Sequence, residues 1–276
     1  MSIKMVAIDM DGTLLNEEKE IALETERALA AAVAGGIEVV IATGRSYVEF
    51  APLMPQLGGV RYAATCAGSS VMELATKEIL FSGSMPLEVA QEFYRLLADD
   101  PMIFEVFSDG FIYVPKDRMD NNAYYTQFSR NPIPPNSRTS VENMTEFLAN
   151  LKTPVEKVHI YYYDNDTRNA GWDKIRHLPL NIATTEPVDL DVSPSNVHKG
   201  VAVKFLADRL GIEPHEVMVI GDSSNDLGMF HYAGTTVAMG NAVPELKEIA
   251  TMVAASNDDN GVAKTLYSLL DGSLSL

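Results

Sequence analysis

The sequence predicts an α/β protein in which a parallel sheet carries a second, inserted α+β domain. Short continuous runs of Val, Ile and Ala alternate with helical segments near both ends of the chain, and this alternation is typical of a parallel sheet covered on both faces. An aromatic-rich middle with hairpin-like strands interrupts the alternation. A chain of 276 residues is long enough for one core and a sizeable insertion.

The first part of the chain supplies three strands and two helices. A strand is expected at 4–8, a helix at 22–34, a strand at 37–42, a helix at 46–57 and a strand at 62–65. Gly35-Gly36 ends the first helix, and Thr43-Gly44 interrupts the second apolar run. The three strands are apolar throughout, which indicates burial on both faces.

The alternation returns after the middle segment. The expected elements are a helix at 201–210, a strand at 217–220, a helix at 225–232, a strand at 235–238, a helix at 244–249, a strand at 252–254 and a helix at 261–270. The two outer parts, 1–83 and 191–276, are therefore predicted to form one core domain.

Residues 84–190 have a different character. Hairpin-like strands are expected at 104–108 and 111–115, and a further strand contains Tyr161-Tyr162-Tyr163. We interpret this stretch as an α+β domain inserted into the core, with most of its aromatic residues packed in its own interior.

Charge and cysteine content exclude several classes of protein. A formal net charge of -17 and a pI near 4.6 argue against general affinity for nucleic acid or anionic lipid. The single cysteine, Cys66, excludes an internal disulfide framework and fits a reducing compartment. The sequence shows no signal-peptide pattern and no apolar run long enough to span a bilayer. We therefore expect a cytoplasmic protein without nucleic-acid or membrane partners; the sequence does not indicate its oligomeric state.

Polar side chains follow several of the predicted strands. Asp9, Thr43 and Asp222 each come directly after an apolar run, and Lys199 stands at the start of a predicted helix. In an open parallel sheet, the loops at the carboxyl ends of the strands gather at one crevice. A polar residue after one strand is explained by an ordinary turn. Polar residues after three strands that end at the same edge indicate a functional site.

Phosphoryl transfer accounts for each of these residue types. A carboxylate with a reference pKa of about 3.9 is ionised at neutral pH, so Asp9 needs no base to act as a nucleophile on phosphorus. Its approach to a phosphate dianion requires a hard cation, and Asp9, Asp222 and the backbone carbonyl of Asp11 offer the oxygen ligands that Mg²⁺ prefers. Thr43 and Lys199 supply a hydroxyl donor and a fixed positive charge to phosphoryl oxygens. Asp11 can protonate the leaving oxygen and then activate water.

These motifs resemble the haloacid dehalogenase superfamily, and specifically its Cof-type phosphatases, over nearly the whole chain. The motifs are Asp9-Met10-Asp11-Gly12-Thr13, Thr43-Gly44-Arg45, Lys199 and Gly221-Asp222-Ser223-Ser224-Asn225-Asp226, in the family's order. The resemblance implies a Rossmann-like core, and a type C2 cap at 84–190 that sets substrate specificity.

The resemblance also assigns roles to residues. It implies that Asp9 is the nucleophile and Asp11 the acid/base. Asp9, Asp11 through its carbonyl, and Asp222 are then the Mg²⁺ ligands, with Asp226 as support for the metal shell. The implied phosphate contacts are the Met10 backbone, Thr43, Gly44, Lys199 and Asn225.

The chain departs from the family at one stretch, where Cys66-Ala67-Gly68 replaces the usual Asn-Gly-Ala. Substrate contacts of relatives are therefore not carried over, and Cys66 is expected to be a small packed residue. Arg45 has two open interpretations, an ion pair with an acidic neighbour at the start of its helix or a contact to substrate. His198 is expected to be a solvated loop residue, and Asp258-Asp259 to be a helix N-cap.

The sequence thus predicts a Mg²⁺-dependent phosphatase that hydrolyses small phosphorylated metabolites, with sugar phosphates as one class, through an aspartyl phosphate. The alternative is a phosphomutase-like or non-hydrolytic phosphosugar-binding protein of the same fold, and the presence of Asp11 favours hydrolysis because it supplies a base for water. A phosphorylated signalling receiver would lack the insert of about 100 residues, and an ion-pumping ATPase would carry transmembrane segments. The sequence does not identify the metabolite or its pathway.

Overall fold

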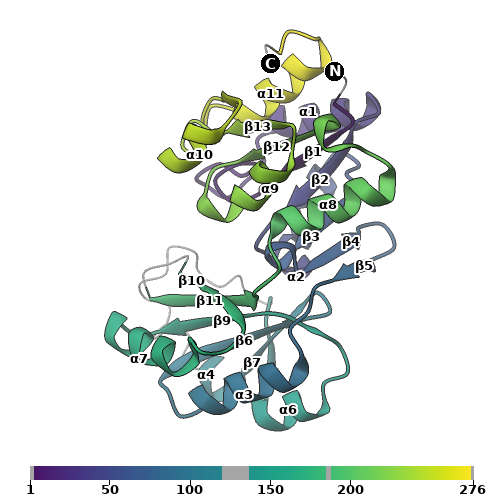
Figure 1. Cartoon of the computed structure of the whole chain (residues 1–276). Helices are drawn as coiled ribbons and strands as arrows, with labels where there is room; N and C mark the ends of the chain where they lie inside the picture. The colour runs from purple at the N-terminus through teal and green to yellow at the C-terminus, as the bar shows by residue number, and fades with distance from the viewer. Residues whose placement is uncertain (1–2, 120–136, 185–187, 275–276) are drawn as a thin grey trace. The chain divides into compact units, whose positions relative to one another are not determined.

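Figure 1 shows the computed structural model, which describes residues 3–119, 137–184 and 188–274. The chain divides into two compact units. Unit 1 comprises Met1–Arg45, Phe50–Phe81 and His198–Leu276, and unit 2 comprises Ser46–Glu49 and Ser82–Val197. The predicted insert at 84–190 lies within unit 2, and its stretches 120–136 and 185–187 are outside the described residues.

Unit 1 is built on an eight-stranded sheet in the order β14-β13-β12-β1-β2-β3-β4-β5. The strands are β1 Met5–Ile8, β2 Glu38–Ala42, β3 Tyr62–Thr65, β4 Ser70–Glu73, β5 Glu78–Ser82, β12 Val217–Gly221, β13 Thr235–Ala238 and β14 Met252–Val253. Pairing is parallel from β14 through β3, while β4 runs antiparallel to β3. The predicted parallel α/β core is therefore confirmed. The β4 and β5 strands were not expected from the sequence.

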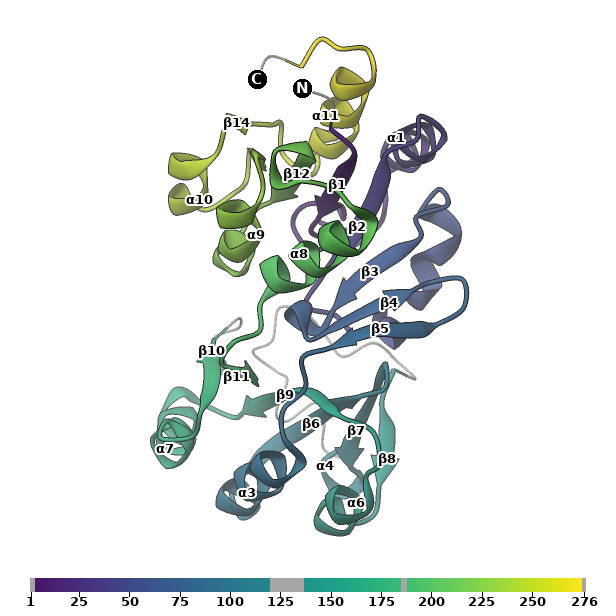
Figure 2. The same ribbon diagram turned by 45° about the vertical axis from the view of Figure 1, so that its right-hand side comes forward.

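Two pairs of helices cover the sheet of unit 1. The main helices are α1 Leu23–Ala34, α8 Lys199–Leu210, α9 Leu227–Tyr232, α10 Pro244–Ile249 and α11 Gly261–Leu270. α1 packs beside α11, and α8 packs beside α9. The crossovers β1–α1–β2 and β12–α9–β13 run in opposite directions along the sheet, so the right-handed rule puts α1 and α9 on opposite faces. Figures 1 and 2 show the strands between the two pairs.

The order of the strands fixes where a site can form. β1 lies between β2 and β12, and the chain extends outward from this centre in both directions. Such a reversal of strand order opens a crevice at the carboxyl ends of the strands. Asp9 follows the last residue of β1, and Asp222 follows the last residue of β12, so both stand at this reversal point.

The helix expected at 46–57 is only partly formed. The α-helix α2 spans Tyr47–Phe50, and a 3₁₀ helix, Ala51–Gln56, continues it. Pro52 and Pro55 lack the N–H groups that an α-helix needs, so the sequence itself explains the shortened helix.

Unit 2 has a six-stranded sheet in the order β10-β11-β9-β6-β7-β8. Its strands are β6 Met102–Ser108, β7 Phe111–Pro115, β8 Thr139–Val141, β9 Val155–Tyr162, β10 Leu180–Ala183 and β11 Asp189–Pro194, and its helices include α3 Leu87–Leu97, α4 Lys116–Met119, α6 Met144–Asn150 and α7 Asn165–Ile175. β7 and β8 pair in parallel, whereas the pairs among β6, β7, β9, β10 and β11 are antiparallel. β11 spans the boundary that the sequence analysis put at residue 191.

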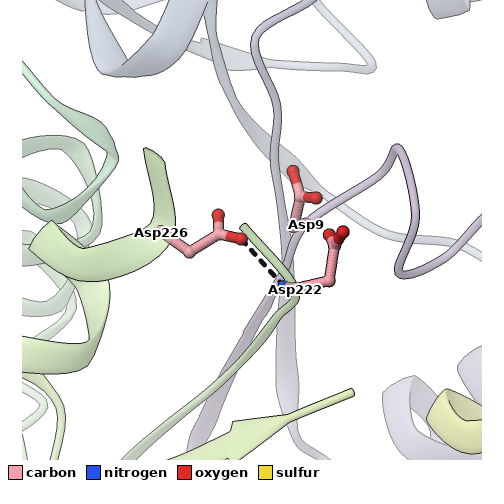
Figure 3. Close-up of side chains that lie close together, drawn as sticks. All are labelled: Asp9, Asp222 and Asp226. Atoms are coloured by element: carbon pink, nitrogen blue, oxygen red, sulfur yellow. Dashed lines mark hydrogen bonds between the residues drawn. The ribbon is translucent and has the colours of Figure 1, made fainter. Parts of the chain in front are cut away.

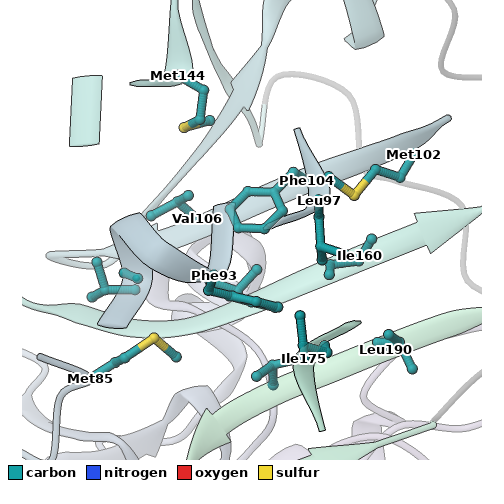
Figure 4. Packing of buried hydrophobic residues seen from close by; sticks show 14 of the residues in the cluster. Met85, Phe93, Leu97, Met102, Phe104, Val106, Met144, Ile160, Ile175 and Leu190 are labelled. Atoms are coloured by element: carbon teal, nitrogen blue, oxygen red, sulfur yellow. The ribbon is translucent and has the colours of Figure 1, made fainter. Parts of the chain in front are cut away.

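The two faces of this second sheet differ in polarity. Phe104, Val106 and Ile160 point to the face on which Phe93 and Leu97 of α3 pack, and they form one buried apolar cluster (Figure 4). Because side chains alternate along a strand, Glu105 and His159 belong to the opposite face. The aromatic residues are thus partly explained by core packing, as expected. No helix among the described residues is long and apolar enough to cross a membrane.

Candidate active site

The loop after β1 carries Asp9 to the edge of the sheet in a fixed orientation. The Asp9 N–H donates to the carbonyl of Ile220 on β12 (3.0 Å), and the Asp9 carbonyl accepts from the Leu14 N–H (3.2 Å). The side chain of Asp9 is almost fully buried. Backbone bonds to a neighbouring strand and to its own loop therefore define the position of the predicted nucleophile.

The same loop approaches Asp222 closely. Gly12 has a φ of +79°, and a Cβ at this position would lie 2.4 Å from Asp222 Oδ2, so only glycine fits. The hydroxyl of Thr13 donates to Asp222 Oδ1 at 2.9 Å. The loop after β1 thus holds the carboxylate that follows β12.

Lys199 is buried at the first turn of α8 and joins three acceptors. Its Nζ donates to Asp9 Oδ1 (2.5 Å), Asp226 Oδ1 (2.7 Å) and Asn225 Oδ1 (3.1 Å). An ammonium group has three hydrogens, so each has an acceptor. Burial disfavours the charged form, but the carboxylates of Asp226 and Asp9 outweigh burial and raise the pKa of Lys199.

Asp226 supports the loop that carries Asp222. Its Oδ2 accepts from the backbone N–H groups of Asp222 (3.0 Å) and Ser223 (3.1 Å), and Figure 3 shows the first of these bonds. A Cβ at Gly221 would lie 2.5 Å from this oxygen, so the approach requires glycine. Because both oxygens of Asp226 are engaged by the chain itself, its geometry suits a supporting residue better than a direct ligand.

The three carboxylates form a compact cluster. Asp9, Asp222 and Asp226 each offer an oxygen within 4.8 Å of the others, and no other group of this kind occurs among the described residues. In Figure 3 the carboxylates of Asp9 and Asp222 point the same way, while that of Asp226 turns toward the Asp222 backbone.

Charge within this cluster is unbalanced. Burial, together with the charges of Asp226 and Asp222, raises the pKa of Asp9 well above its ordinary value despite the opposing charge of Lys199. Burial is also the main reason that the pKa of Asp222 is raised. A crowded set of hard oxygen donors with a surplus of negative charge fits a small divalent cation such as Mg²⁺.

Asp11 lies in a different environment. The Arg45 guanidinium donates two hydrogen bonds to its carboxylate, Nε to Oδ2 (2.8 Å) and Nη2 to Oδ1 (2.6 Å), and we call this pair of bonds the Arg45 fork. Lys19 Nζ lies 3.4 Å from Oδ1. Burial opposes ionisation, but these cations outweigh it and lower the pKa of Asp11. Of the two interpretations of Arg45, the structure shows an ion pair, although its partner is Asp11 rather than an acid at the start of its own helix.

The loop after β2 is anchored to the turn after β3. Thr43 is buried, its N–H donates to the Ala64 carbonyl (2.8 Å), and its hydroxyl oxygen accepts from the Arg45 N–H (3.1 Å). The N–H groups of Cys66 and Ala67 donate to the carbonyls of Arg45 (2.9 Å) and Thr43 (3.0 Å). Cys66 is buried, as predicted.

The structure describes the surroundings of the remaining predicted residues and corrects one prediction. Met10 is fully buried, Gly44 has open space beside its Cα, and His198 is exposed. The N-cap prediction for Asp258-Asp259 is wrong, because Asn260 is the N-cap residue of α11. Asp258 Oδ1 accepts instead from the distant Glu17 N–H, and Asp259 Oδ2 from the Ser256 hydroxyl.

The structure thus joins most of the predicted residues into one hydrogen-bonded network and adds three contacts that the sequence did not reveal. The network contains Asp9, Thr13, Lys199, Asp222, Asn225 and Asp226. The added contacts are the Thr13 hydroxyl on Asp222, the Arg45 fork on Asp11, and an amide of Asn241 on the Gly12 carbonyl. Thr13 and Arg45 stand inside recognised motifs, whereas no sequence signal pointed to Asn241.

Comparison with known proteins agrees with this geometry. Residues 6–266 match the family of haloacid dehalogenase-like hydrolases. The phosphatase YwpJ of Bacillus subtilis is 29% identical, covering 97% of this chain and 100% of its own. The 5-amino-6-(5-phospho-D-ribitylamino)uracil phosphatase YwtE of the same organism is 31% identical, covering 98% and 99%. A solved haloacid dehalogenase-like hydrolase from B. subtilis superposes with a TM-score of 0.81 at 28% identity, covering 96% and 99%.

Proposed function

Because the chain belongs to the haloacid dehalogenase-like hydrolase family, we propose that it is a Mg²⁺-dependent phosphatase that hydrolyses small phosphorylated metabolites through an aspartyl phosphate on Asp9. Phosphatases that match it over nearly their whole length support hydrolysis of phosphoric monoesters. The observation that carries the proposal is the buried Asp9 carboxylate, held 2.5 Å from Lys199 inside the cluster with Asp222 and Asp226.

The donor set fits Mg²⁺. Asp9, Asp222 and the carbonyl of Asp11 would hold the ion. Asp226 would keep the Asp222 loop in place, because its carboxylate accepts hydrogen bonds from the N–H groups of Asp222 and Ser223. When bound, Mg²⁺ would neutralise the carboxylates and the phosphate that must approach them. Burial and the neighbouring carboxylates, which together raise the pKa of Asp9, support this assignment.

In the first half-reaction, an oxygen of Asp9 attacks phosphorus and the bond from phosphorus to the leaving oxygen breaks. Lys199 holds Asp9 and supplies positive charge beside the phosphoryl oxygens. We assign two further phosphate contacts, Thr43 in the loop after β2 and Asn225 in the loop after β12. Asp11 in its protonated form gives its proton to the leaving alcohol.

In the second half-reaction, the Asp11 carboxylate takes a proton from water, and the water oxygen attacks phosphorus. The bond to Asp9 breaks, so inorganic phosphate leaves and the Asp9 carboxylate returns. The Arg45 fork holds Asp11 as a carboxylate, the form that this step requires. In the first half-reaction one of the two Arg45 hydrogen bonds must weaken, because Asp11 then carries a proton on one of its oxygens.

We propose further that unit 2 selects the substrate as a cap. The core residues contact only the phosphate, which is common to every candidate, so discrimination requires contacts to the leaving alcohol. A phosphorylated ribityl compound is the substrate named for one relative, which supports phosphorylated polyols and sugars as the first classes to test.

The test combines turnover with trapping of the intermediate. The purified protein should release inorganic phosphate from members of a panel of phosphorylated metabolites in Mg²⁺, and excess chelator should abolish release reversibly. Acid quenching during turnover should leave one phosphoryl group on the peptide that contains Asp9, detected by mass spectrometry.

Asp9→Asn serves as the decisive variant, because its amide is nearly isosteric but cannot attack phosphorus. Turnover by Asp9→Asn, or undiminished turnover in chelator, would refute the mechanism. Conversion to another phosphorylated product without phosphate release would indicate a phosphomutase, and binding without any conversion a phosphosugar-binding protein.

A further inference from the structure

A loop outside the recognised motifs contacts both acidic loops of the site. This loop joins β13 to α10 and comprises 239–243. The Val243 N–H donates to the Asp222 carbonyl (2.9 Å), and the Met239 N–H donates to the Gly221 carbonyl (2.9 Å). The side-chain Nδ2 of Asn241 donates to the Gly12 carbonyl at 2.7 Å. One short loop is therefore bonded to the segment of Asp11 and to the segment of Asp222.

A second loop, between β14 and α11, supports the first. Asn241 Oδ1 accepts from the Asn257 N–H (3.1 Å), and Asn257 Nδ2 donates to the Leu15 carbonyl (2.9 Å). Asp258 Oδ1 accepts from the Glu17 N–H (2.9 Å). Three polar side chains near the C-terminus thus hold three backbone groups of the segment that follows Asp11.

The two supporting loops are in close backbone contact at Gly240. The Gly240 N–H donates to the Ala255 carbonyl (3.0 Å), and a Cβ at Gly240 would lie 2.7 Å from the Ser256 nitrogen. A Cβ at Gly261 would lie 2.2 Å from the Ala255 oxygen. The close contact at Gly240, next to Asn241, leaves no room for a side chain between the two loops.

From these contacts we infer that Asn241 is a positioning residue for the proposed reaction: it fixes the peptide after Gly12 and thereby the direction of Asp11 relative to Asp222. Gly12 has a positive φ and its carbonyl takes the Asn241 amide, so the loop that bears Asp11 has a defined turn. Without this donor, the Gly12 carbonyl loses its partner, and the Gly12–Thr13 peptide is held, among the described residues, only by the long bond from the Thr13 N–H to the Met10 carbonyl (3.4 Å). The Asp11 carbonyl and the Thr13 hydroxyl on Asp222 then lose their fixed geometry.

The inference rests on the proposed function, but it predicts an effect on metal binding that needs no substrate. Asn241 is exposed, and an exposed amide without a special role changes stability by no more than about 0.5 kcal/mol when it is replaced. Loss of outer support for metal ligands lowers metal affinity or activity by about 10- to 100-fold. The two roles are therefore separable by measurement.

The test uses two variants of Asn241 and a matched control in the full chain. Asn241→Ala removes the amide, and Asn241→Asp keeps its size and the acceptor for the Asn257 N–H but removes the donor to Gly12. Asn150→Asp is the control, because Asn150 is also exposed and donates through Nδ2 to a backbone carbonyl, that of Glu146 (2.9 Å). Calorimetry gives the dissociation constant of Mg²⁺, and thermal unfolding in chelator gives the stability.

We expect Asn241→Ala to weaken Mg²⁺ binding about tenfold and to lower kcat to a similar extent, with little change in thermal midpoint in chelator. Asn241→Asp should also bind Mg²⁺ more weakly, although its added charge attracts the cation, and Asn150→Asp should match the wild type. Wild-type Mg²⁺ affinity in both Asn241 variants would overturn the inference, as would a loss of stability alone. If the wild type hydrolyses no phosphorylated metabolite, the proposed function fails while the Mg²⁺ measurement still decides the role of Asn241.

Discussion

The two units bury charge in different ways. In unit 1, three carboxylates converge on one buried lysine, since Asp9 and Asp226 share Lys199 and Asp222 lies beside them. In unit 2, four acidic side chains lie beside three basic ones. Arg138 binds Glu105 and Glu49, Lys157 binds Asp191, and His159 binds Asp189.

The acidic cluster of unit 1 thus has too little positive charge and can accept a cation, whereas each of these acids in unit 2 already has a basic side chain beside it. Buried charges without enough partners shift their pKa values, and the pKa values of Asp9 and Asp222 are both raised. The network in unit 2 satisfies its acids with side chains of the same unit. An added cation should therefore affect unit 1 and leave the charged face of unit 2 unchanged.

The largest effect is expected from Lys199→Met, which removes the buried cation and nearly preserves side-chain length. Breaking a buried ion pair from one side costs about 3–5 kcal/mol, because the remaining charge is uncompensated. Loss of a charged contact to the phosphoryl group should also lower kcat by about 10²- to 10³-fold. Thermal unfolding in chelator and phosphate release would measure the two effects.

Mg²⁺ should restore part of the stability lost in Lys199→Met. A ligand that binds only the folded state stabilises it by about 2.7 kcal/mol at a hundredfold excess over its dissociation constant. An unchanged midpoint in chelator, or a midpoint that Mg²⁺ fails to raise, would contradict the view that this cluster lacks positive charge.

Arg138→Met is the corresponding change in unit 2. The Arg138 side chain is 3% exposed and forms hydrogen bonds to Glu105 (2.8 and 2.9 Å) and to Glu49 (2.9 Å). Its loss leaves the fully buried Glu105 without this partner, so a destabilisation of about 3 kcal/mol is expected from calorimetry. Mg²⁺ should stabilise Arg138→Met no more than it stabilises the wild type. If Mg²⁺ restored the stability that this variant loses, the proposed difference between the two units would be wrong.

A smaller effect is expected from His159, and it depends on pH. Its Nε2 lies 2.7 Å from Asp189 Oδ2, Glu105 and Lys157 are its other charged neighbours on β6 and β9, and Asp191 lies on β11 with Asp189. Burial disfavours the imidazolium, but the hydrogen bond to Asp189 and the charges of Asp191 and Asp189 outweigh it and raise the pKa of His159 above its ordinary 6.5.

Since the folded-state pKa exceeds the unfolded one, this stabilisation is complete below pH 6.5 and is lost as pH rises through the folded-state pKa. Hydrogen bonds to charged groups contribute about 1.5–3 kcal/mol. The difference in unfolding free energy between wild type and His159→Gln should therefore shrink with rising pH. A difference that is constant from pH 6 to well above neutrality would refute the assignment.

Prediction from sequence succeeded where a local pattern carries the information. The apolar runs gave β3 and β13 with their observed bounds, because a buried parallel strand is apolar on both faces. The ends of the apolar runs that form β1 and β12 placed Asp9 and Asp222 at one edge. Local pattern did not reveal β4, which is only four residues long and has Ser70 and Glu73 at its ends.

Contacts between distant segments were beyond the reach of such patterns. Asp258 was interpreted as a helix cap because the nearest helix begins at Gly261, yet its partner is the Glu17 N–H, 241 residues away. Asn241 likewise meets Gly12 across 229 residues. Only the folded chain brings these groups together.

The smallest expected effect concerns two turns, one in each unit. In unit 2, the tight turn between β6 and β7 has Asp109 and Gly110 at φ values of +55° and +77°, and these residue types suit a left-handed backbone. In unit 1, Cys66 and Ala67 take φ values of +50° and +57° before Gly68 at +95°. Ala67 is therefore strained, whereas Asp109 is not.

Replacing the strained alanine by glycine should stabilise the protein. A left-handed conformation costs a residue with a Cβ about 1–2 kcal/mol, and glycine loses about 0.4–1 kcal/mol of this gain through the greater freedom of the unfolded chain. Ala67→Gly should thus raise the unfolding free energy by about 0.5–1 kcal/mol, and it keeps the N–H that donates to the Thr43 carbonyl. Asp109→Gly should give no gain, and Gly68→Ala should destabilise, because a Cβ there would lie 2.4 Å from the His198 carbonyl oxygen. Chemical denaturation would measure all three, and a destabilised Ala67→Gly would show that the turn carries no strain at this position.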